Sequence, residues 1–181
     1  MLDPTIGTLI DLGAAALLAS AAVHKIRDFE SFAGVFAAYR IAPARGSRAF
    51  AALVPAMELA AALALPWPST HRIAGFGAAG LIALYGAAIA WNLARGRRDL
   101  DCGCGGPRDR RRIAGWMVWR NALIAALLVA AAVVPWSARA LAGVDGLTLG
   151  GGLFAMAVLY RALDRLMGEI APKGFAMRGA R

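Results

Sequence analysis

Five long apolar segments dominate this sequence and limit the folds that it can adopt. They run over about residues 4–23, 49–66, 73–94, 113–135 and 147–160. A helix needs roughly 20 mainly apolar residues to cross the hydrocarbon core of a bilayer. We therefore expect an all-α protein, a polytopic transmembrane helix bundle of four to five spans. The fifth segment is the shortest and must borrow residues from its flanks to cross.

The composition supports a membrane protein and argues against a nucleic-acid-binding one. Hydrophobic residues make up 60% of the chain and charged residues only 17%, whereas soluble domains carry roughly 45–50% and about 25%. The net charge of +9 would suggest nucleic acid as a partner in a soluble protein. In a membrane protein, basic loops instead set topology and contact anionic lipid. The expected partner is thus the lipid bilayer, with no nucleic acid.

The basic residues predict an orientation. Seventeen of the 20 Lys and Arg residues fall in segments 25–48, 95–112 and 161–181, which five spans would bring to one face. Cytoplasmic loops of membrane proteins carry an excess of Lys and Arg. We expect a multi-pass protein of the plasma membrane, with its N-terminus outside and residues 95–112 and the C-terminus on the cytoplasmic face.

Outside the spans, the sequence predicts one short helix and one tail. In residues 28–40, aromatic side chains recur at helical spacing on one side and charged ones lie opposite, which is typical of an amphipathic helix in the membrane interface. The alternative is a loop helix packed on the bundle. No second domain is visible, so residues 1–170 form one expected membrane domain and residues 171–181 a basic tail.

Both cysteines of the chain lie in the stretch "DCGCGG", as Cys102 and Cys104. A disulfide across one intervening residue is strained and hence easily reduced, and the surrounding arginines favour the reactive thiolate. His24 ends the first span on the same face, where it either helps to deprotonate a thiol or anchors the helix. Redox chemistry is the favoured interpretation, against a Cu(I) site or two idle thiols. Because a closed zinc site needs four ligands, no metal is assigned.

Two charged residues inside the apolar segments lie at similar expected depths. Glu58 follows Arg48 by ten residues and Arg120 follows Arg112 by eight, which places them roughly 15 and 12 Å from the basic face. An isolated charge at such a depth costs several kcal/mol, so we expect the two to pair, with Asn121 adding hydrogen bonds. The pair either fixes helix register only or lines a pocket for a ligand such as a quinone.

The ordered pieces "HKIRDFESF", "YRIAP", "VPAMELAAALAL", "DCGCGG" and "WRNALIAALL" resemble the methylamine utilization protein MauE family. That family is related to DoxX-like four-helix membrane proteins, and the resemblance covers about residues 10–135. Its members are thought to assist maturation of the disulfide-rich small subunit of methylamine dehydrogenase. The resemblance implies that the cysteine pair of the family corresponds to Cys102 and Cys104, and that its membrane-embedded Glu and Arg-Asn correspond to Glu58, Arg120 and Asn121.

The resulting hypothesis is a thiol-redox accessory factor, with enzymatic thiol–disulfide exchange left open. A single cysteine pair would need a thioredoxin-like partner or direct contact with a quinone, and a disulfide-containing client. Disulfides of exported proteins form outside the cytoplasm, yet the charges place the cysteine loop inside. Either the loop dips into the bundle, or the orientation is wrong, or the role is cytoplasmic. A carrier for a small metabolite and a structural scaffold for a maturation partner are the alternative functions.

Overall fold

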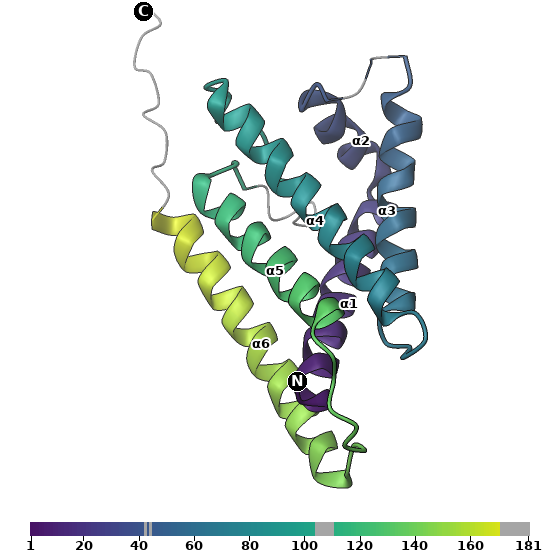
Figure 1. Cartoon of the computed structure of the whole chain (residues 1–181). Coiled ribbons are helices and arrows are strands. Elements are labelled where there is room, and N and C mark those ends of the chain that lie inside the picture. Colours follow the sequence, from purple (N-terminus) through teal and green to yellow (C-terminus); the bar gives the residue numbers. More distant parts are fainter. Residues whose placement is uncertain (42, 44, 104–110, 171–181) are drawn as a thin grey trace, which may run out of the picture.

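The computed structural model describes residues 1–41, 43, 45–103 and 111–170, and this part of the chain confirms the expected all-α fold (Figure 1). It contains six helices that together form a bundle. Their bounds are α1 Pro4–Arg27, α2 Phe29–Ala38, α3 Ser47–Ala64, α4 His71–Ala94, α5 Gly115–Val133 and α6 Gly143–Ile170. All except α2 are long and apolar enough to cross a membrane, so the described residues contain five candidate spans.

Local sequence signals set the first two helices. The Asp3 carboxylate accepts a hydrogen bond from the Thr5 backbone N–H at 2.8 Å, and Pro4 occupies the first turn. Both features favour a helix start. Only Asp28 separates α1 from α2. The chain therefore changes direction directly at the end of α1, and α2 follows at once. The short helix predicted over residues 28–40 is confirmed as α2, while its place in the membrane interface stays a prediction.

Small residues let α4 and α5 approach closely. A Cβ atom added at Gly75 would lie 3.3 Å from the Ala132 Cβ, and one added at Gly86 would lie 3.3 Å from the Asn121 Cβ. Helices in membranes associate largely through such close packing. The resulting contact between α4 and α5 is the most extensive between any two helices of the described chain, followed by that between α1 and α3.

The fifth span differs from the expectation that it is the shortest. At 28 residues, α6 is the longest of the helices described. The sequence estimate stopped early because Arg161 and Asp164 interrupt the apolar run. Asp164 is paired with arginines in the folded bundle, which lowers the cost of continuing the helix through these charges.

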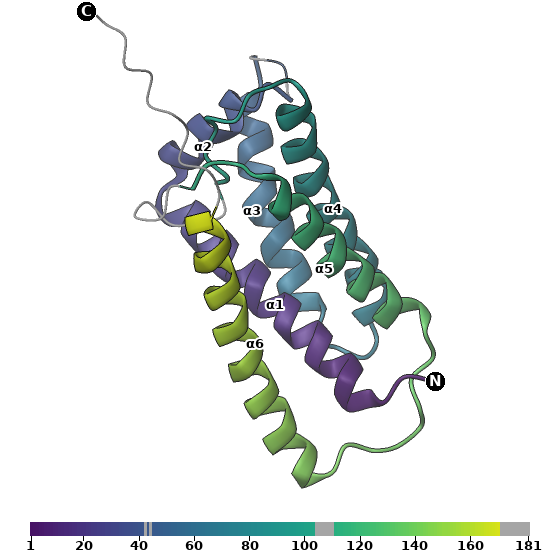
Figure 2. The ribbon, with the colours of Figure 1, turned by 90° about the vertical axis from the view of Figure 1, so that its left-hand side faces the viewer.

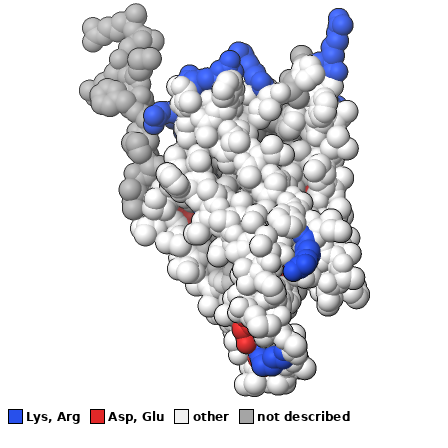
Figure 3. All heavy atoms as spheres, viewed as in Figure 1, with Lys and Arg blue, Asp and Glu red and all other residues white. Residues whose placement is uncertain are grey.

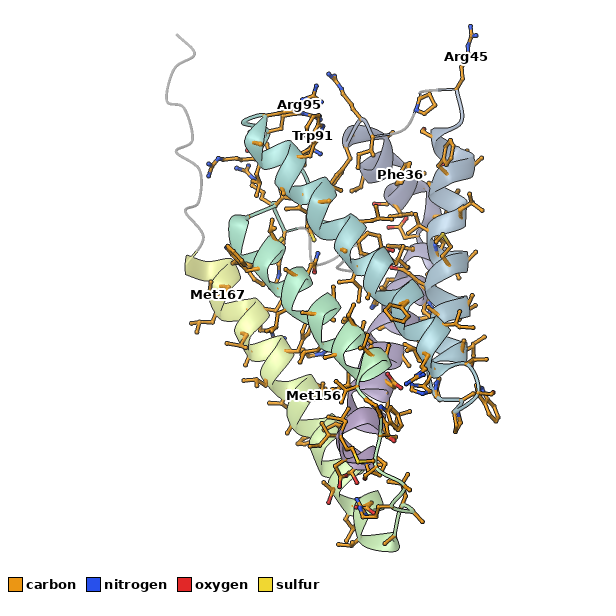
Figure 4. The ribbon with its side chains drawn as sticks, viewed as in Figure 1. Phe36, Arg45, Trp91, Arg95, Met156 and Met167 are labelled. Atoms are coloured by element: carbon orange, nitrogen blue, oxygen red, sulfur yellow. The ribbon has the colours of Figure 1, made fainter. Side chains whose placement is uncertain are left out.

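Helix α6 lies at the edge of the bundle and packs chiefly against α1 (Figure 2). The two helices interlock through glycines. A Cβ at Gly13 would come within 2.9 Å of the Met156 Cε, and one at Gly152 within 3.0 Å of a Leu9 methyl group. Figure 4 shows Met156 at this contact. Each glycine thus makes room for a large side chain of the other helix.

An ionic cluster joins the start of α1 to the start of α6. Arg139 contacts Asp3 at 3.0 Å and Asp145 at 2.7 Å, and the Thr5 hydroxyl donates to Asp145 at 3.0 Å. The hydrogen bond from Arg139, together with that from the Thr5 backbone, holds the pKa of Asp3 below its usual value. This cluster fixes one end of α6.

The outer faces of the long helices are apolar. Large exposed side chains include Leu63, Ile73, Leu84, Trp119, Leu123 and Phe154. In the view of Figure 3 the flank of the molecule is almost free of charge. A continuous apolar surface of this extent, on helices of spanning length, is what contact with a bilayer requires. The protein is a multi-pass membrane protein.

Lys and Arg side chains gather where α4 ends and α5 begins (Figure 3). We call this the basic end; α1 and α6 also end there and α3 begins there (Figure 1). Arg45, Trp91 and Arg95 mark it in Figure 4. The described parts of the three basic segments therefore lie at one end, as expected. That this end faces the cytoplasm stays a prediction, as does the single domain over residues 1–170; the expected tail, 171–181, lies outside the described residues.

Candidate functional site

A cavity of about 730 Å³ opens within the bundle toward the basic end, between α1, α3, α4, α5 and α6. We call it the central cavity. Its volume is in the range of small-molecule sites, roughly 300–1,000 Å³. Five of the six predicted site residues line it: His24, Glu58, Cys102, Arg120 and Asn121. The sixth, Cys104, lies outside the described residues. The fold thus brings together residues that the sequence analysis had chosen for separate reasons.

Glu58 is completely buried and pairs with Lys25, which is only 6% exposed. The Tyr85 hydroxyl donates a second hydrogen bond to the same carboxylate oxygen at 2.8 Å. The Lys25 ammonium also lies 5.0 Å from the Tyr85 ring centroid and 5.3 Å from that of Phe32. A buried charge requires such a partner and such hydrogen bonds. Glu58 is therefore held by α1 and α4.

The expected pairing of Glu58 with Arg120 is wrong. Arg120 contacts Asp164 of α6 at 2.8 Å instead. The depth estimates alone could not identify these partners, because Lys25 was counted among the basic residues at the membrane face and Asp164 was not considered. Their helices carry them to the cavity wall, where each is closer to its partner than Glu58 and Arg120 are to each other.

Asp164 bridges two arginines. Its two carboxylate oxygens form ion pairs with the guanidinium groups of Arg111 at 2.6 Å and Arg120 at 2.8 Å. All three side chains are about one-fifth exposed. The Arg120 guanidinium also lies 5.0 and 5.5 Å from the ring centroids of Trp116 and Tyr160, in the range of cation–π attraction.

Among the buried polar atoms of residues that line the cavity, Glu58 Oε2 and Asn121 Nδ2 have no hydrogen-bond partner within the described part of the chain. Asn121 is 5% exposed. Buried polar groups are satisfied in most proteins, so an unpartnered acceptor and an unpartnered donor on two residues that line one cavity favour a polar ligand or water beside them.

Cys102 is packed against the bundle. Its backbone N–H donates to the Arg111 carbonyl at 2.8 Å, and the Ile113 N–H donates to the Leu100 carbonyl at 2.9 Å. These bonds tie residues 100–102 to the segment that leads into α5. The Cys102 side chain is half-buried and contacts the apolar cluster around Tyr39 and Ile89.

Gly103 lets the chain turn against α2. Its φ of +70° is in the left-handed region, and an added Cβ would lie 3.2 Å from a Val35 methyl group. Cys102 and Gly103 also line a second, smaller cavity of about 90 Å³ with Phe32, Val35 and Lys25. The described part of the cysteine loop thus packs against the bundle, and which of the three possibilities left open by the charge pattern holds stays a prediction.

His24 is exposed at the mouth of the central cavity. Its predicted role toward the thiols stays a prediction. Sequence reasoning missed Lys25, Tyr85, Arg111 and Asp164 as site residues. Only Lys25 carried a usable signal, because it directly follows His24 at the end of a span; Asp164 lay beyond the apolar run, and Tyr85 lay within one.

The sequence of the chain is similar to one protein family and to several curated proteins. The family model described as methylamine utilisation protein MauE matches residues 3–137. The chain is 36% identical over 172 residues to the methylamine utilization protein MauE of Methylophilus methylotrophus, covering 94% of this chain and 90% of that protein. It is 38% identical over 146 residues to that of Paracoccus versutus, covering 81% and 77%. No solved structure matches significantly.

Proposed function

The chain belongs to the MauE family, and from this premise we propose that it is a thiol-redox accessory factor of methylamine utilization. Its role is to supply disulfides to a client such as the small subunit of methylamine dehydrogenase. The position of Cys102 carries the proposal. A half-buried thiol, held by a backbone hydrogen bond at the wall of a cavity within a membrane bundle, is accessible to a ligand in that cavity.

The cavity wall around Cys102 suits thiol chemistry. Lys25 lines both cavities that Cys102 lines. The backbone carbonyl of Arg111 accepts the hydrogen bond of the Cys102 N–H, and the Arg111 guanidinium donates to Asp164 in the central cavity. Nearby cations stabilise a thiolate over a thiol and thereby raise its reactivity. The same groups would stabilise the thiolate that leaves when a disulfide at this position is attacked.

The proposed reaction is a dithiol–disulfide exchange. A client thiolate, or that of a thioredoxin-like partner, attacks the Cys102–Cys104 disulfide, and one cysteine leaves as a thiolate. The second client thiolate then attacks the mixed disulfide, so the client departs with a disulfide and the pair is reduced by two electrons and two protons. A quinone of the membrane accepts both electrons and both protons as it becomes a quinol. Glu58, Arg120 and Asn121 are the residues proposed to hold it.

The test combines function with redox state. In a methylamine-grown host that lacks its own MauE protein, Cys102→Ser and Cys104→Ser should each abolish growth on methylamine, whereas Glu30→Gln, an exposed change at the same end, should not. The purified protein, titrated with glutathione buffers and read by alkylation and mass, should switch between two and no alkylatable thiols. If both thiols stay alkylatable at every ratio of glutathione to its disulfide, the redox proposal is wrong.

One observation favours a second candidate, a carrier for a small metabolite. The central cavity contains a fully buried carboxylate with an unpartnered oxygen, which is the kind of group that marks a substrate path in a membrane. A carrier would tolerate both cysteine changes and fail on Glu58→Gln. A structural scaffold, the third alternative, would tolerate all three.

A further inference from the structure

We propose that the mouth of the central cavity binds the anionic head group of a membrane amphiphile, such as a long-chain carboxylate, on Arg111 and Arg120, with Asp164 of α6 as the internal anion that it displaces. This site shares the central cavity, Arg111, Arg120 and Asn121 with the proposed function, but binding there does not use the cysteines. It rests on the arrangement of charge and apolar surface in the cavity and on the way in which α6 closes it.

The cavity is polar at one end and apolar at the other. Among its described lining residues, six carry Lys or Arg side chains and three carry Asp or Glu. These charges lie toward the basic end, while Leu17, Leu18, Ile82 and Ile124 line the part farther along α1, α4 and α5. From Leu17 to Arg27 the wall extends along α1 for about 15 Å. A lipid monolayer has the same order, with a charged surface above apolar chains.

Two arginines at the mouth already hold a carboxylate. Arg111 and Arg120 contact the two oxygens of Asp164 at 2.6 and 2.8 Å. Arginine binds carboxylate and phosphate groups through such paired, charge-assisted hydrogen bonds. The geometry that accepts Asp164 therefore also accepts the head group of a carboxylate or phosphate ligand.

The helix that carries Asp164 is suited to yield. In its apolar stretch no residue is buried, and it packs chiefly against α1. Its other end is fixed by Arg139, Asp3 and Asp145. Displacing the Asp164 carboxylate would thus loosen the end of α6 at the cavity mouth while the opposite end stays attached, and Figure 2 shows α6 on the outside of the bundle.

A second observation points to a ligand in the same space. Asn121 and Glu58 line the cavity and are nine-tenths or more buried, and Asn121 Nδ2 and Glu58 Oε2 have no hydrogen-bond partner in the described chain. The Asn121 amide is one residue from Arg120 and can donate to an oxygen of the head group. The apolar wall beyond it requires an apolar chain on the ligand, which favours a source in the membrane over a water-soluble anion.

Binding to the full-length protein in a non-ionic detergent tests the proposal, with oleate as the probe and oleyl alcohol as its neutral match. Native mass spectrometry should show oleate bound at least about tenfold more tightly than oleyl alcohol, the smallest effect expected of a hydrogen bond to a charged group. Hexanoate should bind more weakly still. Equal binding of oleate and oleyl alcohol would overturn the anion site, and equal binding of hexanoate and oleate would overturn the membrane source.

Variants of the cavity mouth make opposite predictions. Arg111→Gln and Arg120→Gln should weaken oleate binding about tenfold or more, whereas Asp164→Asn should strengthen it, because the internal competitor is gone. Arg98→Gln, an exposed arginine of the same end that does not line the cavity, is the control and should bind as the unmodified chain does.

The sign of the Asp164→Asn effect decides between a binding site and a merely structural ion cluster. Weaker binding in that variant would refute the proposal even if the arginine variants fail to fold. Repeating the titration with Cys102→Ser should give the same affinities, which separates this site from the redox proposal.

Discussion

Replacing Lys25 by methionine should destabilise the bundle by about 3–5 kcal/mol, because the change leaves the Glu58 carboxylate buried without its cation. The magnitude follows from burial. Glu58 is 0% and Lys25 only 6% exposed, so the carboxylate would lose its cation in a buried position. The double variant Lys25→Met/Glu58→Leu should be less destabilised than Lys25→Met alone, since apolar residues of similar size leave no stranded charge.

The chain offers a matched control in the pair of Arg48 and Glu30, which also joins two helices at the basic end. These side chains are 68% and 71% exposed, and exposed ion pairs contribute at most about 1 kcal/mol. Arg48→Gln should therefore change stability little. The contrast between the two pairs isolates the effect of burial, because each loses one cation from one carboxylate.

Thermal unfolding of the purified protein in detergent is the assay. For a chain of this size, 1 kcal/mol corresponds to roughly 2–4 °C in Tm, so Lys25→Met should lower Tm by about 6–20 °C and Arg48→Gln by about 4 °C or less. Equal losses in the two variants would refute the reasoning. A double variant as unstable as Lys25→Met would show that the lost stability comes from packing and not from the stranded charge.

Two further predictions use pairs of glycines. Gly86→Val should lower Tm and Gly80→Val should not, because a Cβ at Gly86 would lie 3.3 Å from the Asn121 Cβ of α5, while nothing lies within 4 Å of a Cβ at Gly80. Comparable Tm values would contradict the close packing of α4 on α5. Gly103→Ala should disturb the cysteine loop, read as a changed alkylation rate of the thiols, and do so more than Gly96→Ala. Both glycines have positive φ, but only a Cβ at Gly103 meets another side chain, so equal effects would attribute the change to backbone strain alone.

The number and approximate positions of the spans followed from the sequence by itself. The preference of an apolar segment for lipid is a property of its own side chains, so the segments at 4–23, 49–66, 73–94 and 113–135 were recognisable before any packing was considered. The short helix over residues 29–38 was recognisable from its own sequence too, because its aromatic side chains recur at helical spacing. The fifth span was underestimated, because Arg161 and Asp164 count against a helix only until their partners are known.

The sequence also identified five described residues that line one cavity, since charged, amide and thiol groups near a membrane bundle are conspicuous wherever they occur. Only the tertiary structure decided how they pair. Depth along a helix can be counted in residues, which is why Glu58 and Arg120 were expected to meet. The direction in which each side chain points depends on how the helices are rotated and packed against one another, and that packing gives Glu58 to Lys25 and Arg120 to Asp164.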